Sequence, residues 1–179
     1  LSTQGAYIAA EFVTFLDAFN IPVVSLTNVK GYAAVVNQEK TIAKAVAKLT
    51  YAFANATVPK VNLITGDAFG TAYLAMNSKS IGADIEYAWP TARVGMMDPE
   101  SAVKIIYSEE IKTSEDKKAF LASKKDEYNA LQSSALSAAK RGYVDDIIEP
   151  DATRKRLIAA FEMLFTKRED RPVKKHGAV

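Results

Sequence analysis

The chain has 179 residues, of which 49% are hydrophobic and 25% are charged, so one domain with a substantial core is expected. The formal net charge is only +2, which argues against nucleic-acid binding, and the absence of cysteine excludes disulfides and thiolate metal sites. We find no cationic leader and no apolar run near the roughly 20 residues of a membrane span, so a cytoplasmic globular protein is expected.

Helices and short apolar strands alternate along the first half of the chain. The segments expected to form strands are residues 23–26, 61–64, 83–88 and 92–95. The helices expected around them lie at residues 3–19, 38–56 and 72–80, the last with Gly82 as its C′ residue. Such alternation is typical of an α/β domain with a mostly parallel sheet.

The second half is predicted to be mainly helical. Asp98, Pro99 and Glu100 combine a cap, a first-turn proline and an early acid, which together favour a helix start. A long helix is expected from Ser114 to Gly142, an extended segment or strand over 143–148, and a last helix over 151–165. We therefore predict one domain over residues 1–165 and a basic C-terminal tail over 166–179.

A glycine-containing loop is the clearest chemical signal. It spans residues 66–73, between a predicted strand and a predicted helix. A helix N-terminus presents unpaired amides, which can bind an oxyanion without any side chain. A second loop over 28–32 follows another strand and is expected to face the same cleft. The only histidine, His176, is in the tail, so a Ser-His-Asp triad is not expected. The residues alone also allow the loop to be a structural connection.

Segments along nearly the whole chain resemble the biotin-dependent carboxyltransferase family. The resemblance is to the C-terminal half of the carboxyltransferase (beta) subunit of acetyl- and propionyl-CoA carboxylases and related acyl-CoA decarboxylases. The matching segments, in order, are residues 17–22, 56–61, 68–76, 82–84, 87–92, 97, 102–103, 105–107, 142–150 and 174–177.

The resemblance implies a crotonase-like (ClpP/crotonase) fold with a helical C-terminal extension. It also implies carboxyl transfer from carboxybiotin, on a biotin carboxyl carrier protein, to the α-carbon of a short acyl-CoA. In that scheme the backbone amides of Thr71 and Ala72 form an oxyanion hole, and Gly31, Tyr32 and Gly70 line the biotin side. Coenzyme A binds mostly to an N-terminal carboxyltransferase half. Biotin carboxylase is a further partner, a homo-oligomer is expected, and no metal is implied.

Four positions depart from the family pattern: Lys30 and Tyr32 replace the commoner proline and phenylalanine, and the other two lie in the loop over 66–73. Asp67 stands where a basic residue is usual, and Thr71 stands where glycine or serine is common. Two alternatives to a carboxylase stay open: a decarboxylase that works in reverse, and a half-domain that only assembles with partners. A crotonase-type hydratase is disfavoured because residues 72–80 contain no carboxylate. A separated half is also expected to expose apolar surface and to associate.

Overall fold

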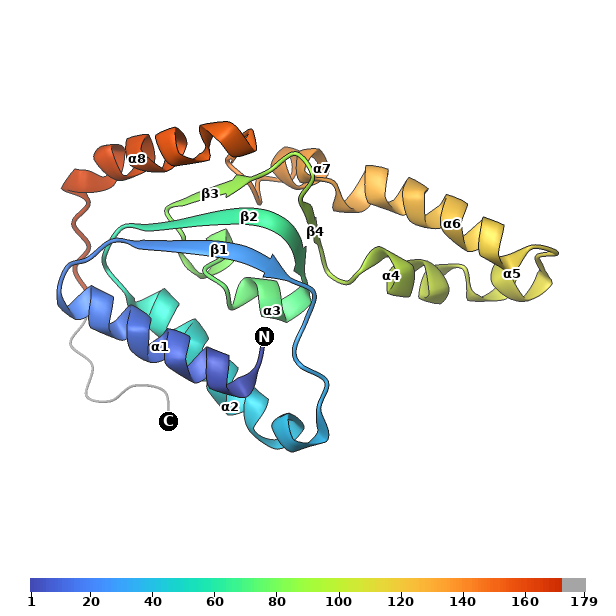
Figure 1. The fold of residues 1–179 in the computed structure, drawn as a ribbon, viewed down its shortest axis with the longest axis horizontal. Helices are drawn as coiled ribbons and strands as arrows, with labels where there is room; N and C mark the ends of the chain where they lie inside the picture. Colours follow the sequence, from blue (N-terminus) through green and yellow to red (C-terminus); the bar gives the residue numbers. More distant parts are fainter. Residues whose placement is uncertain (172–179) are drawn as a thin grey trace.

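The computed structural model describes residues 1–171, and its core in that range is a five-stranded sheet in which all paired strands are parallel (Figure 1). The strand order is β1-β2-β3-β5, and β4 pairs with the end of β2. The strands are β1 (Val23–Val29), β2 (Lys60–Phe69), β3 (Ile85–Ala88), β4 (Arg93–Gly95) and β5 (Asp146–Ile147). The predicted α/β architecture with a parallel sheet is confirmed. The predicted family signature at 174–177 lies outside the described residues.

One face of the sheet is covered by α1 (Thr3–Ala18), α2 (Val36–Asn55) and the short α3 (Gly70–Leu74) (Figure 1). Ser2 caps α1 by accepting a hydrogen bond from the amide of Gly5 at 3.1 Å. The buried face of α1 consists of the small residues Ala6, Ala10 and Val13, which allow close packing on α2. The larger apolar residues of α1 therefore remain exposed; they are Ile8, Phe12, Phe15 and Phe19.

The opposite face is covered only in part, by α8 (Thr153–Met163) with the 3-10 turns η3 (Pro150–Ala152) and η4 (Leu164–Thr166) on either side of it. Ala160 of α8 packs with Val61, Leu63, Ile85 and Tyr87 of β2 and β3. The outward side chains of β1 are not covered: Val24 is 41% exposed and Leu26 is 62% exposed. The fold thus leaves apolar surface exposed on α1 and on β1.

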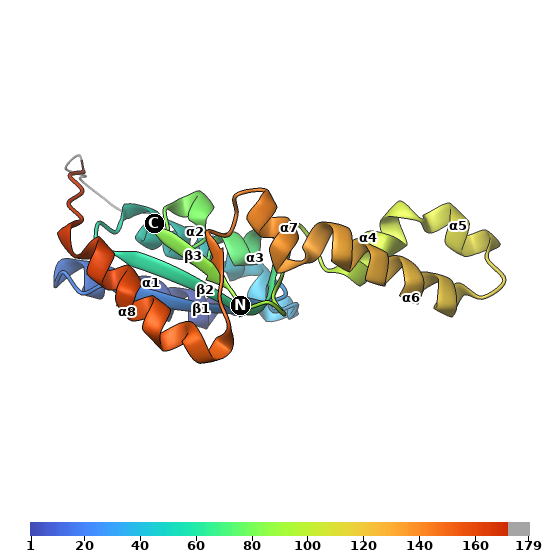
Figure 2. The same ribbon diagram turned by 90° about the horizontal axis from the view of Figure 1, so that it is seen from above.

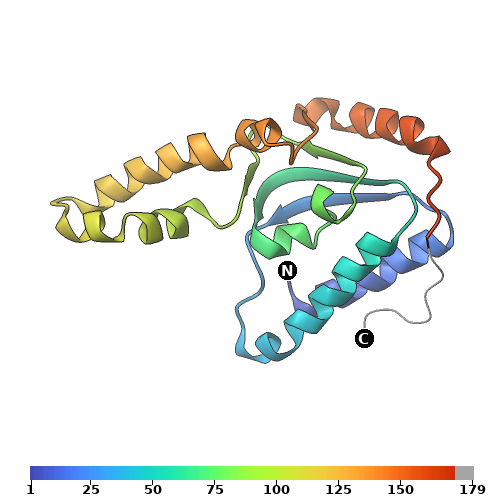
Figure 3. The ribbon, with the colours of Figure 1, turned by 180° about the vertical axis from the view of Figure 1, so that it is seen from behind.

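An arm of helices projects from the sheet after β4 (Figures 2 and 3). Its elements are α4 (Pro99–Ile106), α5 (Ser108–Thr113), α6 (Lys117–Tyr128), the π-helical turn η2 (Asn129–Ser133) and α7 (Ala135–Lys140). The predicted long helix is divided, because Ser134 leaves the helical conformation and caps α7 at the amide of Ser137. The chain then returns to the sheet through β5 and closes with α8, so the helices of the second half are not one continuous extension.

The first part of the loop predicted over residues 66–73 is not a loop, because β2 continues through Gly66 to Phe69. A Cβ at Gly66 would lie 2.7 Å from Oδ1 of Asn28. Glycine therefore leaves room for Asn28, whose side-chain oxygen accepts from the amide of Asp67 at 3.0 Å. The only sharp turn between this strand and α3 is at Gly70. The following helix ends at Leu74, earlier than predicted, and Gly82 ends the 3-10 turn η1 (Lys79–Ile81) at φ +105°.

Candidate functional site

The turn from β2 into α3 lies at the carboxyl ends of the strands, where parallel α/β sheets usually bind ligands. Gly70 adopts φ +62°, in the left-handed region, and a Cβ there would approach the carbonyl oxygen of Met96 to 3.1 Å. Both features favour glycine at this position. The chain therefore enters α3 abruptly, and the first amides of the helix have no partner within it.

A cavity of about 510 Å³ opens beside this turn. Elements that are distant in sequence enclose it: α3, η1, β4, η2, α7 and the segment after α7. Its lining residues are Gly70, Thr71, Tyr73, Leu74, Ser80, Val94, Gly95, Met96, Gln132, Ala138, Arg141 and Tyr143. The cavity is mainly apolar with a few polar groups, the usual character of a small-molecule site.

The predicted site residues are only partly brought together. Gly70 and Thr71 line the cavity, and Ala72 lies directly behind them with 1% of its surface exposed. Tyr32 packs against the apolar cluster that contains Ala72, but neither Tyr32 nor Gly31 lines the cavity. The amides of Thr71 and Ala72 are therefore in the first turn of α3, whereas no residue of the 28–32 loop, which was expected to face the same cleft, lines this cavity.

Asp67, the acidic departure from the family pattern, is neutralised by cations. Its side chain is 10% exposed and accepts from Nε of Arg93 at 2.7 Å, while the Arg93 guanidinium also forms an ion pair at 2.6 Å. Nζ of Lys30 lies 3.7 Å from the second carboxylate oxygen. Arg93 also stacks over the ring of Phe69, 5.7 Å from its centroid. The Asp67 carboxylate thus points at β4, where the guanidinium of Arg93 balances its charge.

A double-mutant cycle tests this pairing. Arg93→Gln is expected to lower the free energy of unfolding by about 2 kcal/mol, because it leaves a mostly buried carboxylate without its main partner. Asp67→Asn should cost less, and the double variant should cost no more than Arg93→Gln alone. Urea unfolding of the four proteins measures the coupling. Strictly additive losses would show that the contact contributes nothing.

A second set of polar groups, which was not predicted, lies under α3. Glu86 of β3 is 0% exposed and accepts from the hydroxyl of Tyr73 at 2.8 Å and from Nδ2 of Asn62 at 2.9 Å. Its other oxygen accepts from the amide of Lys79 at 2.6 Å. Burial raises the pKa of Glu86 to about 7, against the opposing effect of these hydrogen bonds.

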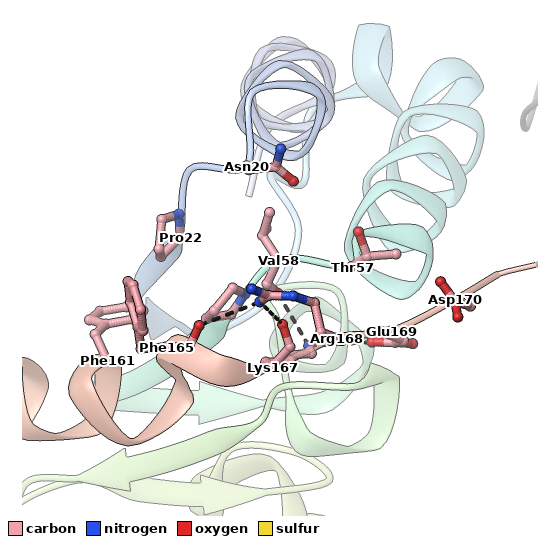
Figure 4. A pocket seen from close by; sticks show the side chains of 11 residues that line it. Asn20, Pro22, Thr57, Val58, Phe161, Phe165, Lys167, Arg168, Glu169 and Asp170 are labelled. Carbon is pink, nitrogen blue, oxygen red and sulfur yellow. Dashed lines mark hydrogen bonds and ion pairs between the residues drawn. The ribbon is translucent and has the colours of Figure 1, made fainter.

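A larger cavity, of about 670 Å³, lies at the opposite ends of the strands, between α1, the start of β2 and the end of α8 (Figure 4). Its main cation is already paired. Nζ of Lys167 lies 2.9 Å from Asp84 and 3.3 Å from Glu169, and it donates to the carbonyl oxygen of Val58 at 3.2 Å. This cavity lies far from the glycine turn and offers no comparable set of amides, so the turn at Gly70 is the better candidate.

Within residues 1–171, no cluster of three or more His, Cys, Asp or Glu side chains is placed to hold a metal ion. In the same range, no helix is both long and apolar enough to cross a membrane.

Known proteins resemble this chain over its full length. A model of the carboxyl transferase domain matches residues 1–179. Methylmalonyl-CoA decarboxylase subunit alpha of Propionigenium modestum is 48% identical over 171 residues, which cover 95% of this chain and 33% of that protein. The putative propionyl-CoA carboxylase beta chain of Bacillus subtilis (strain 168) is 47% identical over 180 residues, which cover 100% of this chain and 36% of that protein.

Solved structures agree with the sequence matches. A crystal structure of transcarboxylase 12S, described as a hexamer assembly with methylmalonyl-coenzyme A bound, matches with a TM-score of 0.93 and 44% identity. The match covers 99% of this chain and 34% of that one. The chain therefore spans about a third of the length of these relatives.

Proposed function

Because the chain belongs to the carboxyl transferase family, we propose that it supplies the biotin side of the active site of an acyl-CoA carboxylase. The observation that supports this proposal is the turn at Gly70, which begins α3 beside a mainly apolar cavity lined by Gly70 and Thr71. In this proposal the sheet and its helices are one half of a crotonase-like unit.

The proposed chemistry needs few side chains. Carboxybiotin, delivered as a substrate on a carrier protein, releases carbon dioxide by cleavage of its N–C bond and leaves a ureido anion. This anion takes the α-proton of the acyl-CoA, and the resulting enolate attacks the carbon dioxide to form the new C–C bond. The amides of Thr71 and Ala72 donate hydrogen bonds to the ureido oxygen, whose negative charge grows as the carboxyl group leaves. Neutralisation of Asp67 by Arg93 keeps a repulsive charge away from that oxygen. The apolar cavity wall limits water, which strengthens both hydrogen bonds.

The coenzyme A side is proposed to come from an N-terminal carboxyltransferase half, since this chain spans about a third of its relatives. Two exposed apolar surfaces support docking of such a half and of further protomers: the outer face of α1 and the uncovered strand β1 beside α8. Biotin carboxyl carrier protein and biotin carboxylase are the further partners in this proposal.

Reconstitution tests the proposal. Alone, the chain is expected to transfer no measurable label from carboxybiotin to acetyl- or propionyl-CoA, because nothing positions the acyl group. Together with an N-terminal half, hereafter the complete enzyme, it should transfer label. Turnover by the chain alone would contradict the proposal that the N-terminal half binds and positions the acyl-CoA. A complete enzyme that binds acyl-CoA but transfers no label would favour a half-domain that only assembles with partners.

A second candidate is the reverse reaction, in which a malonyl- or methylmalonyl-CoA loses its carboxyl group to biotin. The similarity to methylmalonyl-CoA decarboxylase subunit alpha, at 48% identity, supports it. The same two amides serve both directions, because the same charged transition state is crossed. Measuring initial rates in both directions with the complete enzyme separates the two candidates.

A further inference from the structure

Glu86 is a buried carboxylate in the middle of a parallel sheet, where an apolar side chain is the usual occupant. Burying an ionisable carboxyl group is costly unless hydrogen bonds compensate. Donors from three different elements do so: Tyr73 from α3, Asn62 from β2 and the amide of Lys79 from η1. The Glu86 side chain therefore connects the sheet both to α3, through Tyr73, and to η1, which follows α3, through the amide of Lys79.

The orientation of this network is set from the neighbouring strand. The hydroxyl of Thr27 on β1 donates to Oδ1 of Asn62 at 2.7 Å, which leaves Nδ2 of Asn62 facing Glu86. Burial and the neighbouring Glu86 raise the pKa of Tyr73, so its phenol stays neutral. A neutral phenol can donate to a carboxylate or accept from a carboxylic acid. The contact between Tyr73 and Glu86 therefore persists in both protonation states of Glu86.

The helix α3, which this network contacts, is too short to be stable by itself. α3 has five residues, fewer than an isolated helix needs, so its position depends on tertiary contacts. Tyr73 directly follows Ala72, is 6% exposed and also lines the cavity. Its hydroxyl donates a hydrogen bond to Glu86 of β3 and so ties α3 to the sheet. This tie is made at the residue that directly follows the two proposed donors.

We propose that Tyr73 and Glu86 are positioning residues that hold the amides of Thr71 and Ala72 at the cavity. This inference rests on the proposed function and adds residues to it that act by holding the proposed donors in place. Hydrogen-bond donors to a developing oxyanion are effective only near 2.7–3.1 Å, roughly, so a small shift of α3 weakens both at once. Substrate binding in the other half does not depend on α3, so the predicted defect is in kcat and not in KM for the acyl-CoA.

Kinetics of variants in the complete enzyme test the inference. Tyr73→Phe keeps the ring and removes one hydrogen bond, and it should lower kcat roughly 10- to 100-fold with KM nearly unchanged. Glu86→Leu should lower kcat similarly, and Tyr73→Phe added to it should lower kcat no further. Glu86→Gln keeps an oxygen for Tyr73 and Asn62 but places its NH2 group against the amide of Lys79, so it should recover only part of the kcat that Glu86→Leu loses.

Thr153→Val is the matched control. It removes the partner of the Trp89 indole N–H, a 2.9 Å hydrogen bond between side chains on the opposite face of the sheet. It should lower the melting temperature about as much as Tyr73→Phe and leave kcat unchanged. Amide hydrogen exchange adds a second measurement at Ala75 and Met76, whose amides donate to the carbonyl oxygens of Thr71 and Tyr73 at 3.1 and 2.9 Å. Tyr73→Phe should speed exchange at these two amides, and Thr153→Val should not.

The outcomes separate this inference from the proposed function. If removing the amide of Ala72 abolishes transfer but folded Tyr73→Phe keeps full kcat, the positioning role is wrong and the proposed function stands. If neither change affects kcat, both are wrong. An equal loss of kcat in Tyr73→Phe and Thr153→Val would show a general loss of stability, which also overturns the inference. If Glu86→Leu does not fold, Tyr73→Phe and its exchange rates decide the matter alone.

Discussion

Removing the N–H group of Ala72 is expected to lower kcat of the complete enzyme about 10²–10³-fold and to leave KM for the acyl-CoA nearly unchanged. Ala72 is the third residue of α3, so no carbonyl within the helix accepts from its amide. In the proposed mechanism this amide binds the ureido oxygen most strongly when its charge is greatest. An interaction that strengthens toward the transition state changes kcat and not substrate binding.

The form of the variant matters because Ala72 is buried. Ala72→Pro removes the N–H, but its ring enters the cluster formed with Ala68 and Val94, and it disfavours the helical conformation of Thr71. Replacing the amide at Ala72 by an ester, with lactic acid in place of alanine, removes the same N–H and keeps the methyl group. The ester variant is therefore the decisive one, with its melting temperature measured beside its rate.

Two controls keep the amides and change the side chains. Ala72→Gly keeps the N–H and removes the buried methyl group, and Thr71→Ser keeps both the amide and the hydroxyl. Each should cost far less in kcat than the ester, because the proposed donors are backbone groups. A folded ester variant with nearly full carboxyl-transfer activity would remove this turn from the mechanism.

Elements whose ends are set by local chemistry were predictable from the sequence. The Asp98 side chain caps α4 at the amides of Glu100 and Ser101, with Pro99 in the first turn as predicted. Gly82 also ends a helical turn in the left-handed conformation, but that turn is η1 and not the helix over 72–80 that it was predicted to end. In each case the signal and the structure lie within about one helical turn, where capping acts.

Features that depend on distant contacts were not predictable. Gly66 was predicted to lie in a loop, yet it lies in β2. Its lack of a Cβ makes room for the side chain of Asn28, which is distant in the sequence. The large apolar residues of α1 recur at helical spacing, yet Phe12 is 59% exposed and alanines are buried instead. The sequence of α1 alone does not indicate whether its large apolar residues or its alanines pack against α2.

The candidate site divides in the same way. Gly70 and Thr71 were found because a glycine between a strand and a helix is a local pattern. Glu86 was missed because a single acid between apolar residues normally indicates the solvent side of a half-buried strand. Only the cover of α3 over that face makes it buried. The useful signal was the polar Asn62 at the matching place in the preceding strand, which pairs with Glu86 in the sheet.

Raising the pH from about 5 to 8 is expected to destabilise the wild-type chain by about 3 kcal/mol relative to Glu86→Gln. Burial raises the pKa of Glu86 from its ordinary value of 4.5 to about 7, and the nearby Asp145 carboxylate acts in the same direction. The hydrogen bonds from Tyr73, Lys79 and Asn62 only partly oppose this. In the unfolded chain the same carboxyl group ionises near its ordinary pKa.

The sign follows from the two pKa values. Between them the folded chain retains a proton that the unfolded chain has lost, so the stabilising contribution is complete below the unfolded pKa. It is lost as pH rises through the folded pKa. Other titrating groups, including His176, are present in both proteins and cancel in the comparison.

Urea unfolding at several pH values, followed by circular dichroism, measures the difference between wild type and Glu86→Gln. Glu100→Gln is the control, because Glu100 is exposed on α4 and its hydrogen bond to Lys104 lowers its pKa. A lowered carboxyl pKa changes stability only at lower pH, so this variant should run parallel to wild type between about pH 5 and 8. Stability curves of wild type and Glu86→Gln that stay parallel over the same range would show that Glu86 is ionised throughout. The polar network under α3 would then hold a permanent buried charge, compensated by its three donors.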